Sequence, residues 1–210
     1  MGREAGIFFL WAMGYQLAWL PGRLCPVPDV LLPACWLAGF LLWCFRTGRA
    51  SFVRLERTEA RWLSLWPLGI LPAWNLLHCG LPRWDTPALL AAVAEELLFR
   101  GVLLAFLEKG HPRGGVFLSA ILFAAYHWVS PDRGGLQLWC ALSAGVCYGE
   151  VTLRAGAVWP AVLAHLAVNF TGARGMEDSS PSLWLWAAVP LVWGIRSFME
   201  RKRDSSCGYT

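Results

Sequence analysis

Long apolar runs recur along this 210-residue chain, and they limit its possible folds more than any other feature. Charges, prolines and glycines divide the chain into eight such segments, at 5–21, 27–45, 62–81, 87–107, 115–130, 135–149, 155–172 and 182–199. Runs of about 17–25 apolar residues are typical of transmembrane helices, and a membrane barrel would instead show short alternating segments. The sequence therefore predicts an all-α, polytopic membrane helix bundle of about eight transmembrane helices.

The composition supports a membrane protein. Hydrophobic residues make up 57% of the chain and charged residues 15%, whereas about 25% is usual for charged residues in soluble domains. We therefore do not expect a soluble enzyme, a nucleic-acid-binding protein, a disordered scaffold or a secreted disulfide module. The seven cysteines show no CxxC spacing, and we interpret them as small apolar residues. The expected partner is the lipid bilayer, and no nucleic acid is expected.

The basic residues predict an orientation for this bundle. If all eight segments cross the membrane and the N-terminus is cytoplasmic, thirteen Lys and Arg lie in cytoplasmic loops and four in outer loops. Both termini should then face the cytoplasm. The Arg- and Ala-rich composition and the short loops favour an integral, multi-pass protein of a prokaryotic inner (plasma) membrane.

The fourth segment places three charged residues in the middle of an apolar run, namely Glu95, Glu96 and Arg100. Each charge at the centre of a membrane helix costs about 2.5–3.5 kcal/mol on insertion scales, so these side chains require partners. Glu96 and Arg100 are four residues apart and should form an ion pair, whereas Glu95 is rotated by about 100° and should point to a different neighbour. The alternative is a purely structural polar cluster that holds helices together.

Two later segments add further polar side chains. His127 lies near the end of the fifth segment, and His165 and Asn169 lie four residues apart in the seventh. Together these groups match the parts needed to hydrolyse an amide inside the bundle. Glu95 would be the base that activates water, His127 would assist, and His165 and Asn169 would donate to the oxyanion. Glu96 and Arg100 would support them.

Three ordered motifs resemble those of the family of CAAX-processing and bacteriocin-processing intramembrane proteases, which includes the CAAX prenyl endopeptidases. The family pattern is EExxxR, FxxxH and HxxxN, and the matching residues here are Glu95 to Arg100, Phe123 to His127 and His165 to Asn169. The stretch from Gly145 to Pro160 also resembles the lead-in to the third motif. The resemblance covers about residues 85–170 and implies proteolysis within the membrane by a glutamate-centred site, with the first Glu as base.

The resemblance leads to a three-part division of the chain. Residues 1–84 should hold about three N-terminal transmembrane helices, 85–172 a catalytic core, and 173–210 a C-terminal transmembrane helix with a basic cytoplasmic tail. Members of the family were long described as metalloproteases, and zinc accepts Glu and His ligands. No HExxH is present, however, and Asn169 is a poor zinc ligand, so we expect no cofactor and keep zinc as the alternative.

The expected function is that of an endopeptidase whose substrate is a protein or peptide with a membrane-associated segment. In the eight-span arrangement the site opens outward, which suits maturation of an exported protein at a C-terminal segment. The alternative is a non-catalytic immunity or chaperone-like membrane protein that keeps the polar cluster for packing or binding, and a transporter is a more distant one. Among other polar residues, His78 and His111 are expected to be incidental, and Glu150 and Arg154 to form a surface pair.

Overall fold

The computed structural model describes residues 2–24, 30–49, 69, 72–73, 77, 85–110, 114–128, 135–170 and 181–207. The elements within these ranges are all helical, so the predicted all-α class is confirmed. They are α1 (Gly2–Leu24), α2 (Leu31–Arg46), α4 (Thr86–Glu96), the π-helix η3 (Leu97–Leu103), α5 (Leu104–Gly110), α6 (Gly115–Trp128), α7 (Gly135–Ala155), α8 (Trp159–Phe170) and α9 (Pro181–Cys207).

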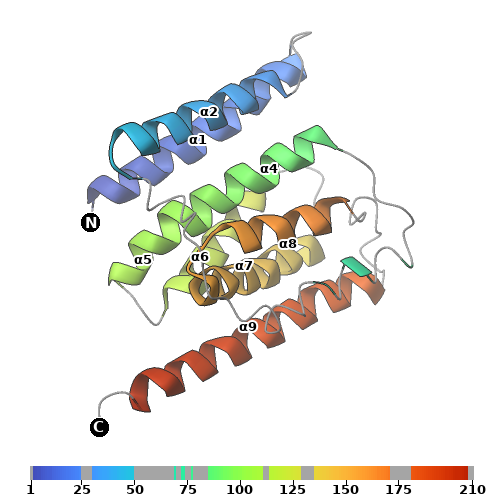
Figure 1. The fold of residues 1–210 in the computed structure, drawn as a ribbon. Coiled ribbons are helices and arrows are strands. Elements are labelled where there is room, and N and C mark those ends of the chain that lie inside the picture. The colour runs from blue at the N-terminus through green and yellow to red at the C-terminus, as the bar shows by residue number, and fades with distance from the viewer. Residues whose placement is uncertain are drawn as a thin grey trace.

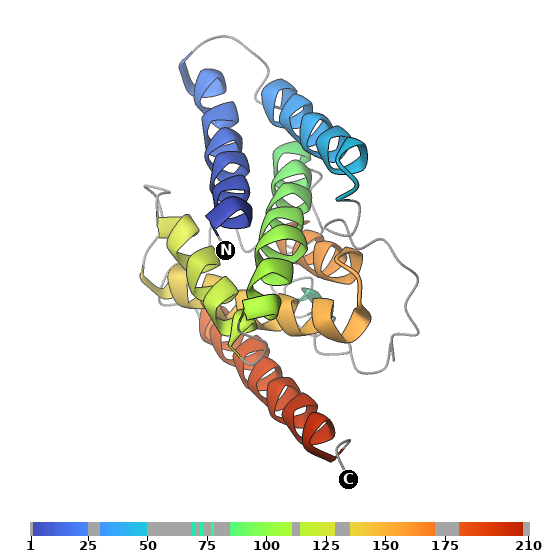
Figure 2. The ribbon, with the colours of Figure 1, turned by 90° about the vertical axis from the view of Figure 1, so that its left-hand side faces the viewer.

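The helices are stacked so that α4 and α7 lie in the interior of the bundle. Helices α1 and α2 lie next to each other at one side of the molecule, and α9 lies at the opposite side (Figure 1). Helix α4 continues through η3 into α5 as one run below α1 and α2, and η3 contacts α1 (Figure 2). Helix α7 packs against α6, α8 and α9. Residues from α4 to α8 therefore meet near η3.

Seven of the eight predicted apolar segments coincide with helices, and the segment 62–81 falls almost wholly outside the described residues. Helix α7 runs on to Ala155, past the predicted end at 149. Within the described ranges, no helix combines the length and the apolar character needed to cross a membrane. The eight spans, their orientation and the three-part division thus stay predictions.

Local sequence explains where the central helices begin and end. The Asp85 carboxylate accepts a hydrogen bond of 3.2 Å from the backbone N–H of Ala88, and Pro87 occupies the first turn of α4, as helix starts favour. Helix α7 ends before Gly156, whose φ of 63° lies in the left-handed region that glycine adopts without strain. That turn directs α8, and with it His165, back against α4.

The π-helix η3 was not predicted from the sequence. It begins directly after Glu96, contains Arg100, and all seven of its residues are buried. A π-turn adds a residue to the helical repeat, and such turns are frequent at functional sites. The Ser119 hydroxyl of α6 donates a hydrogen bond of 3.1 Å to the carbonyl oxygen of Phe99, inside this segment. The wide turn is thus tied to the neighbouring helix.

Glycines allow α7 to approach its neighbours closely. A Cβ at Gly145 would lie 2.9 Å from the Cα of Ala120, and one at Gly149 would lie 2.9 Å from Val116, both on α6. On the other side, a Cβ at Gly194 of α9 would lie 2.6 Å from Val146. Small residues at i and i+4 let helix backbones meet in this way, notably in membranes.

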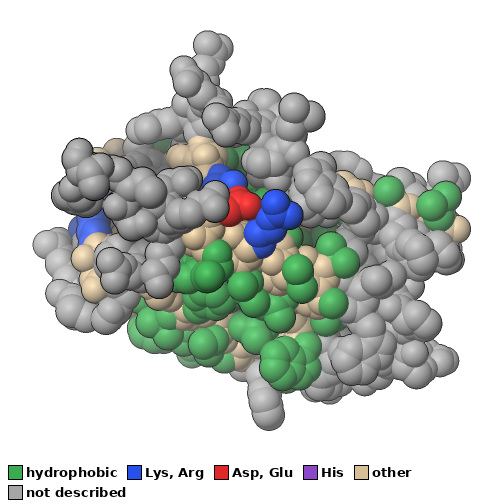
Figure 3. Space-filling view, turned by 90° about the horizontal axis from the view of Figure 1, so that it is seen from below, with side chains coloured by type: hydrophobic (Ala, Val, Ile, Leu, Met, Phe, Trp, Pro, Cys, Tyr) green, Lys and Arg blue, Asp and Glu red, His purple; other side chains and the backbone are tan. Residues whose placement is uncertain are grey.

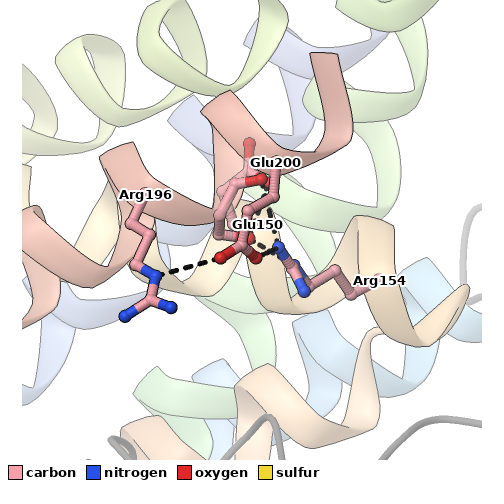
Figure 4. Close-up of polar contacts among 5 residues, drawn as sticks. Glu150, Arg154, Arg196 and Glu200 are labelled. Carbon is pink, nitrogen blue, oxygen red and sulfur yellow. Dashed lines mark hydrogen bonds and ion pairs between the residues drawn. The ribbon is translucent and has the colours of Figure 1, made fainter. Parts of the chain in front are cut away.

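A second polar cluster joins α7 to α9, and it corrects the prediction of a Glu150–Arg154 surface pair. Glu150 is fully buried and accepts a hydrogen bond of 3.1 Å from the Ser197 hydroxyl. Arg154 donates hydrogen bonds to the Ser197 hydroxyl, to the Ser197 backbone oxygen at 3.1 Å and to Glu200 at 2.8 Å (Figure 4). The sequence spacing alone gave no sign that α9 would cover this end of α7.

The outer face of this region combines charge and apolar surface. Arg196 and Glu200 form an ion pair of 2.9 Å on α9, and the Arg196 side chain is 79% exposed. Seen from below, acidic and basic side chains lie together on this face of the molecule and are bordered by hydrophobic surface (Figure 3). Exposed apolar side chains of α9 include Val192, Ile195 and Met199.

The close approach of α6 and α7 predicts a cost for any side chain at Gly145. We expect Gly145→Ala to lower the free energy of unfolding by about 1–3 kcal/mol, because the new Cβ forces the two backbones apart. Thermal unfolding of the purified protein measures this. The matched control is Gly39→Ala on α2, where a Cβ meets no atom within 4 Å, and it should leave the melting temperature unchanged or raise it. Equal effects of the two substitutions would contradict the close approach.

The position of Glu200 predicts a pH effect. Hydrogen bonds from Arg154 and then Arg196 hold the pKa of Glu200 below its ordinary value of 4.5. A carboxylate with a lowered pKa stabilises the fold above its unfolded-state pKa, and this contribution disappears as the pH falls through the folded-state pKa. When the pH is lowered below 4.5, the melting temperature of Glu200→Gln should therefore fall by less than that of the wild type. Parallel curves would show that these contacts do not persist in solution.

Candidate active site

The two adjacent acids of α4 point to different partners, as their rotation around the helix predicts. Glu95 lies toward α6, where its Oε2 is 3.6 Å from Nε2 of His127. Glu96 contacts Arg100 at 3.1 Å through one oxygen and Nδ1 of His165 at 2.9 Å through the other. The structure thus brings together Glu95 with His127, and Glu96 with Arg100 and His165.

Glu96 and Arg100 form the predicted pair in a fully enclosed position. Both side chains are 0% exposed. The Arg100 Nη2 donates a hydrogen bond of 3.3 Å to the carbonyl oxygen of Gly145, and the guanidinium carbon lies 4.2 Å from the centre of the Phe123 ring. A cation over an aromatic face is attracted to it, so Arg100 links η3 to both α6 and α7.

Hydrogen bonds indicate which nitrogen of each imidazole carries a hydrogen. Nδ1 of His127 lies 2.8 Å from the carbonyl oxygen of Phe123, and a carbonyl can only accept, so this nitrogen donates. Nδ1 of His165 faces the Glu96 carboxylate, which is paired with a guanidinium and acts as an acceptor in the same way. In the neutral form, each ring then has Nε2 as an acceptor, and in the protonated form as a donor.

Aromatic rings hold the two imidazoles apart and in place. The Phe123 ring lies 4.4 Å from His127 and 6.1 Å from His165 between ring centres, edge-on to both. Tyr148 of α7 stacks on His165 at 5.5 Å with an interplanar angle of 25°. Sequence reasoning noted Phe123 and Tyr148 within the motifs but assigned neither a role. The structure shows them as the walls of the site.

Asn169 contacts the N-terminal part of α4. Its side-chain amide donates a hydrogen bond of 3.3 Å to the carbonyl oxygen of Ala88 on α4. Asn169 therefore fastens α8 to the first turns of α4, and its role as an oxyanion donor stays a prediction.

The described residues contain no group of three or more His, Cys, Asp or Glu side chains that could hold a metal ion. Glu95 and His127 form one pair, and His165 belongs to the separate contact with Glu96. His78 and His111 lie outside the described residues. The expectation of catalysis without a cofactor stays a prediction.

Comparison with known families confirms the resemblance read from the motifs. Residues 78–171 match the family model of the type II CAAX prenyl endopeptidases, Rce1-like. This part of the chain is Rce1-like. The matched residues include Glu95, Glu96, Arg100, His127, His165 and Asn169. The match supports a CAAX-type endopeptidase, whereas no curated protein and no solved structure matches the chain.

The enclosed Glu96–Arg100 pair predicts a large effect of removing one partner. Arg100→Met should lower the free energy of unfolding by about 3–5 kcal/mol, because it leaves the Glu96 charge buried without its guanidinium. The double substitution Glu96→Gln with Arg100→Met should recover part of that loss, and thermal or denaturant unfolding measures both. If the double variant were no more stable than Arg100→Met alone, the two side chains would not be coupled as the structure indicates.

Proposed function

We propose that the protein is an intramembrane endopeptidase of the glutamic type, with Glu95 as the base that activates water. The observation that carries this proposal is the Glu95–His127 contact beside the buried Glu96–Arg100–His165 cluster. The Glu95 and His127 side chains are 12% and 10% exposed, so they are shielded but still accessible to a small molecule. The Rce1-like match over residues 78–171 supports the same class of reaction.

The proposed reaction is the addition of water to a peptide carbonyl. Oε2 of Glu95 and Nε2 of His127 are 3.6 Å apart, which is longer than a direct hydrogen bond. A water molecule beside the pair can form a hydrogen bond to each of these two atoms. Glu95 takes a proton from this water molecule while the water oxygen attacks the carbonyl carbon. The C–N bond of the tetrahedral intermediate then breaks, and the Glu95–His127 pair returns the proton to the leaving amine.

His165 and Asn169 are the proposed donors to the oxyanion. His165 can donate through Nε2 when its ring is protonated, while Nδ1 keeps its contact with Glu96. Asn169 can take this role only with its second amide hydrogen or after leaving the Ala88 carbonyl. Glu96 and Arg100 hold His165 in position and do not touch the substrate.

The proposed substrate is a protein or peptide with a membrane-associated segment, cleaved at or near a C-terminal segment. We further propose that the protein is integral to the membrane, with both termini cytoplasmic and the site open to the outer side. Large apolar side chains exposed on α1, such as Phe9, Leu10 and Met13, support contact with lipid, because monomeric soluble proteins rarely expose contiguous apolar surface.

Substitution of Glu95 tests the catalytic proposal. Glu95→Gln keeps the size of the side chain and removes the base, so it should abolish cleavage and leave folding intact. We would compare the termini of membrane and secreted proteins by terminal-peptide mass spectrometry in cells that express wild type or Glu95→Gln at equal levels. Specific new termini should appear only with the wild type.

The control for this experiment is Glu200→Gln, the same chemical change on α9, which should leave the new termini in place. If Glu95→Gln still rescued the phenotype of a deletion and all termini were identical, the non-catalytic immunity or chaperone-like function would be correct instead. Loss of cleavage with EDTA or phenanthroline, and its return with zinc, would show that the reaction depends on a metal.

A further inference from the structure

Tyr126 precedes His127 on α6 and has no role in the reaction described above. Its ring packs edge-on against Phe99 of η3, with 5.3 Å between ring centres. Phe99 follows Glu95 by four residues on the same continuous helical run. The Tyr126 ring therefore lies on the side of that run from which Glu95 reaches His127.

The hydroxyl of Tyr126 is buried and makes no hydrogen bond to any described residue. A buried hydroxyl without a partner costs about 1–3 kcal/mol, and such a group in a native structure calls for an explanation. The phenol ring alone would provide the same packing as phenylalanine at this position. The hydroxyl is thus a hydrogen-bond donor that the fold itself does not use.

The Tyr126 ring lies beside that of His127, with 5.9 Å between ring centres, and His127 contacts Glu95. Gln16 of α1 is close enough to influence the Tyr126 hydroxyl but does not complete a hydrogen bond of normal geometry. Tyr15 is 2% exposed, so α1 is buried against its neighbours at this level. Helix α1 precedes the segment that matches the family, which begins at residue 78.

A general base and an oxyanion donor must lie on either side of one carbonyl group, each about 3 Å from a reacting atom. Tyr126 lies next to the Glu95–His127 pair, and its buried hydroxyl has no hydrogen-bond partner among the described residues. Asn169, the donor expected from the sequence, is instead bonded to Ala88. Tyr126 is thus a further candidate donor to the carbonyl that Glu95–His127 attacks.

We propose that the Tyr126 hydroxyl donates a hydrogen bond to the carbonyl oxygen of the scissile peptide, and that this bond strengthens as the oxygen gains negative charge. The phenol keeps its proton throughout, so the proton balance of the reaction is unchanged. Water supplies the hydroxyl of the new carboxyl group, and its second proton goes to the amine through Glu95 and His127. This inference rests on the proposed function and adds a substrate-binding residue to it.

The test compares Tyr126→Phe with Thr152→Val. Both substitutions remove a buried hydroxyl that has no partner among the described residues, and both keep the shape of the side chain. Thr152 lies on α7, and its hydroxyl has no role in the proposed reaction. Removing an unpaired hydroxyl should leave the melting temperature unchanged or raise it in both variants, so differences in activity cannot come from folding.

The kinetic probe is an internally quenched peptide that spans the cleavage site found by the terminal-peptide comparison. Tyr126→Phe should lower kcat by about 100-fold with KM nearly unchanged, because an oxyanion donor acts mainly in the transition state. A phosphonamidate analogue of the same peptide, which carries an anionic oxygen in a tetrahedral group, should bind more weakly by about the same factor. Thr152→Val should match the wild type in kcat, in KM and in its affinity for the phosphonamidate.

The possible outcomes separate this inference from the proposed function. If the wild type cleaves, Glu95→Gln does not, and Tyr126→Phe keeps the wild-type kcat, then the role of Tyr126 is overturned and the proposed function stands. A large fall in the melting temperature of Tyr126→Phe, with kcat unchanged at low temperature, would overturn it as well, because the hydroxyl would then be structural. If the wild type generates no new termini, the proposed function fails and this inference fails with it.

Discussion

The Glu96 carboxylate is the group on which the arrangement of the other site residues depends. It is fully buried and contacts Arg100 of η3 and His165 of α8 at the same time. Removing two charges from water is costly, and only close pairing with further hydrogen bonds compensates for it. Three helical segments must therefore meet at this point, and Arg100 adds a fourth through the carbonyl of Gly145 on α7. Glu95, which we propose as the catalytic base, is the residue directly before Glu96.

Close backbone packing makes this meeting of charges possible. Gly145 provides the carbonyl for Arg100, and its lack of a side chain lets α7 contact α6 at Ala120. The π-turn of η3 begins after Glu96 and ends beyond Arg100. Phe123 covers the guanidinium and also separates the two imidazoles. Packing and electrostatics thus act on the same few residues, so stability and the proposed chemistry should respond together to substitutions there.

Helices outside the Rce1-like segment also take part in the structure around the site. Helix α1 contacts η3, where the Phe8 ring packs edge-on against Phe99. Helix α9 covers Glu150 through Ser197 and is tied to Arg154 through Glu200. The matched residues 78–171 therefore contain the polar motifs, and helices on either side of this segment in the chain pack against it. In a low-dielectric site of this kind, preorganised donors have their largest effect on a developing charge.

The amino-acid order predicted the helical class and most helix positions, because these depend on apolar run length and local spacing. The Glu96–Arg100 pair and the divergence of Glu95 follow in the same way from the repeat of the α-helix. The tertiary structure decided which histidine meets which acid, the burial of Glu150, the bond from Asn169 to Ala88, and the position of Tyr126. Those contacts join residues far apart in the chain, such as Glu96 and His165, which are 69 positions apart. The geometry of these contacts depends on how closely glycines let neighbouring helices approach each other. A local sequence pattern does not determine the distance between two helices.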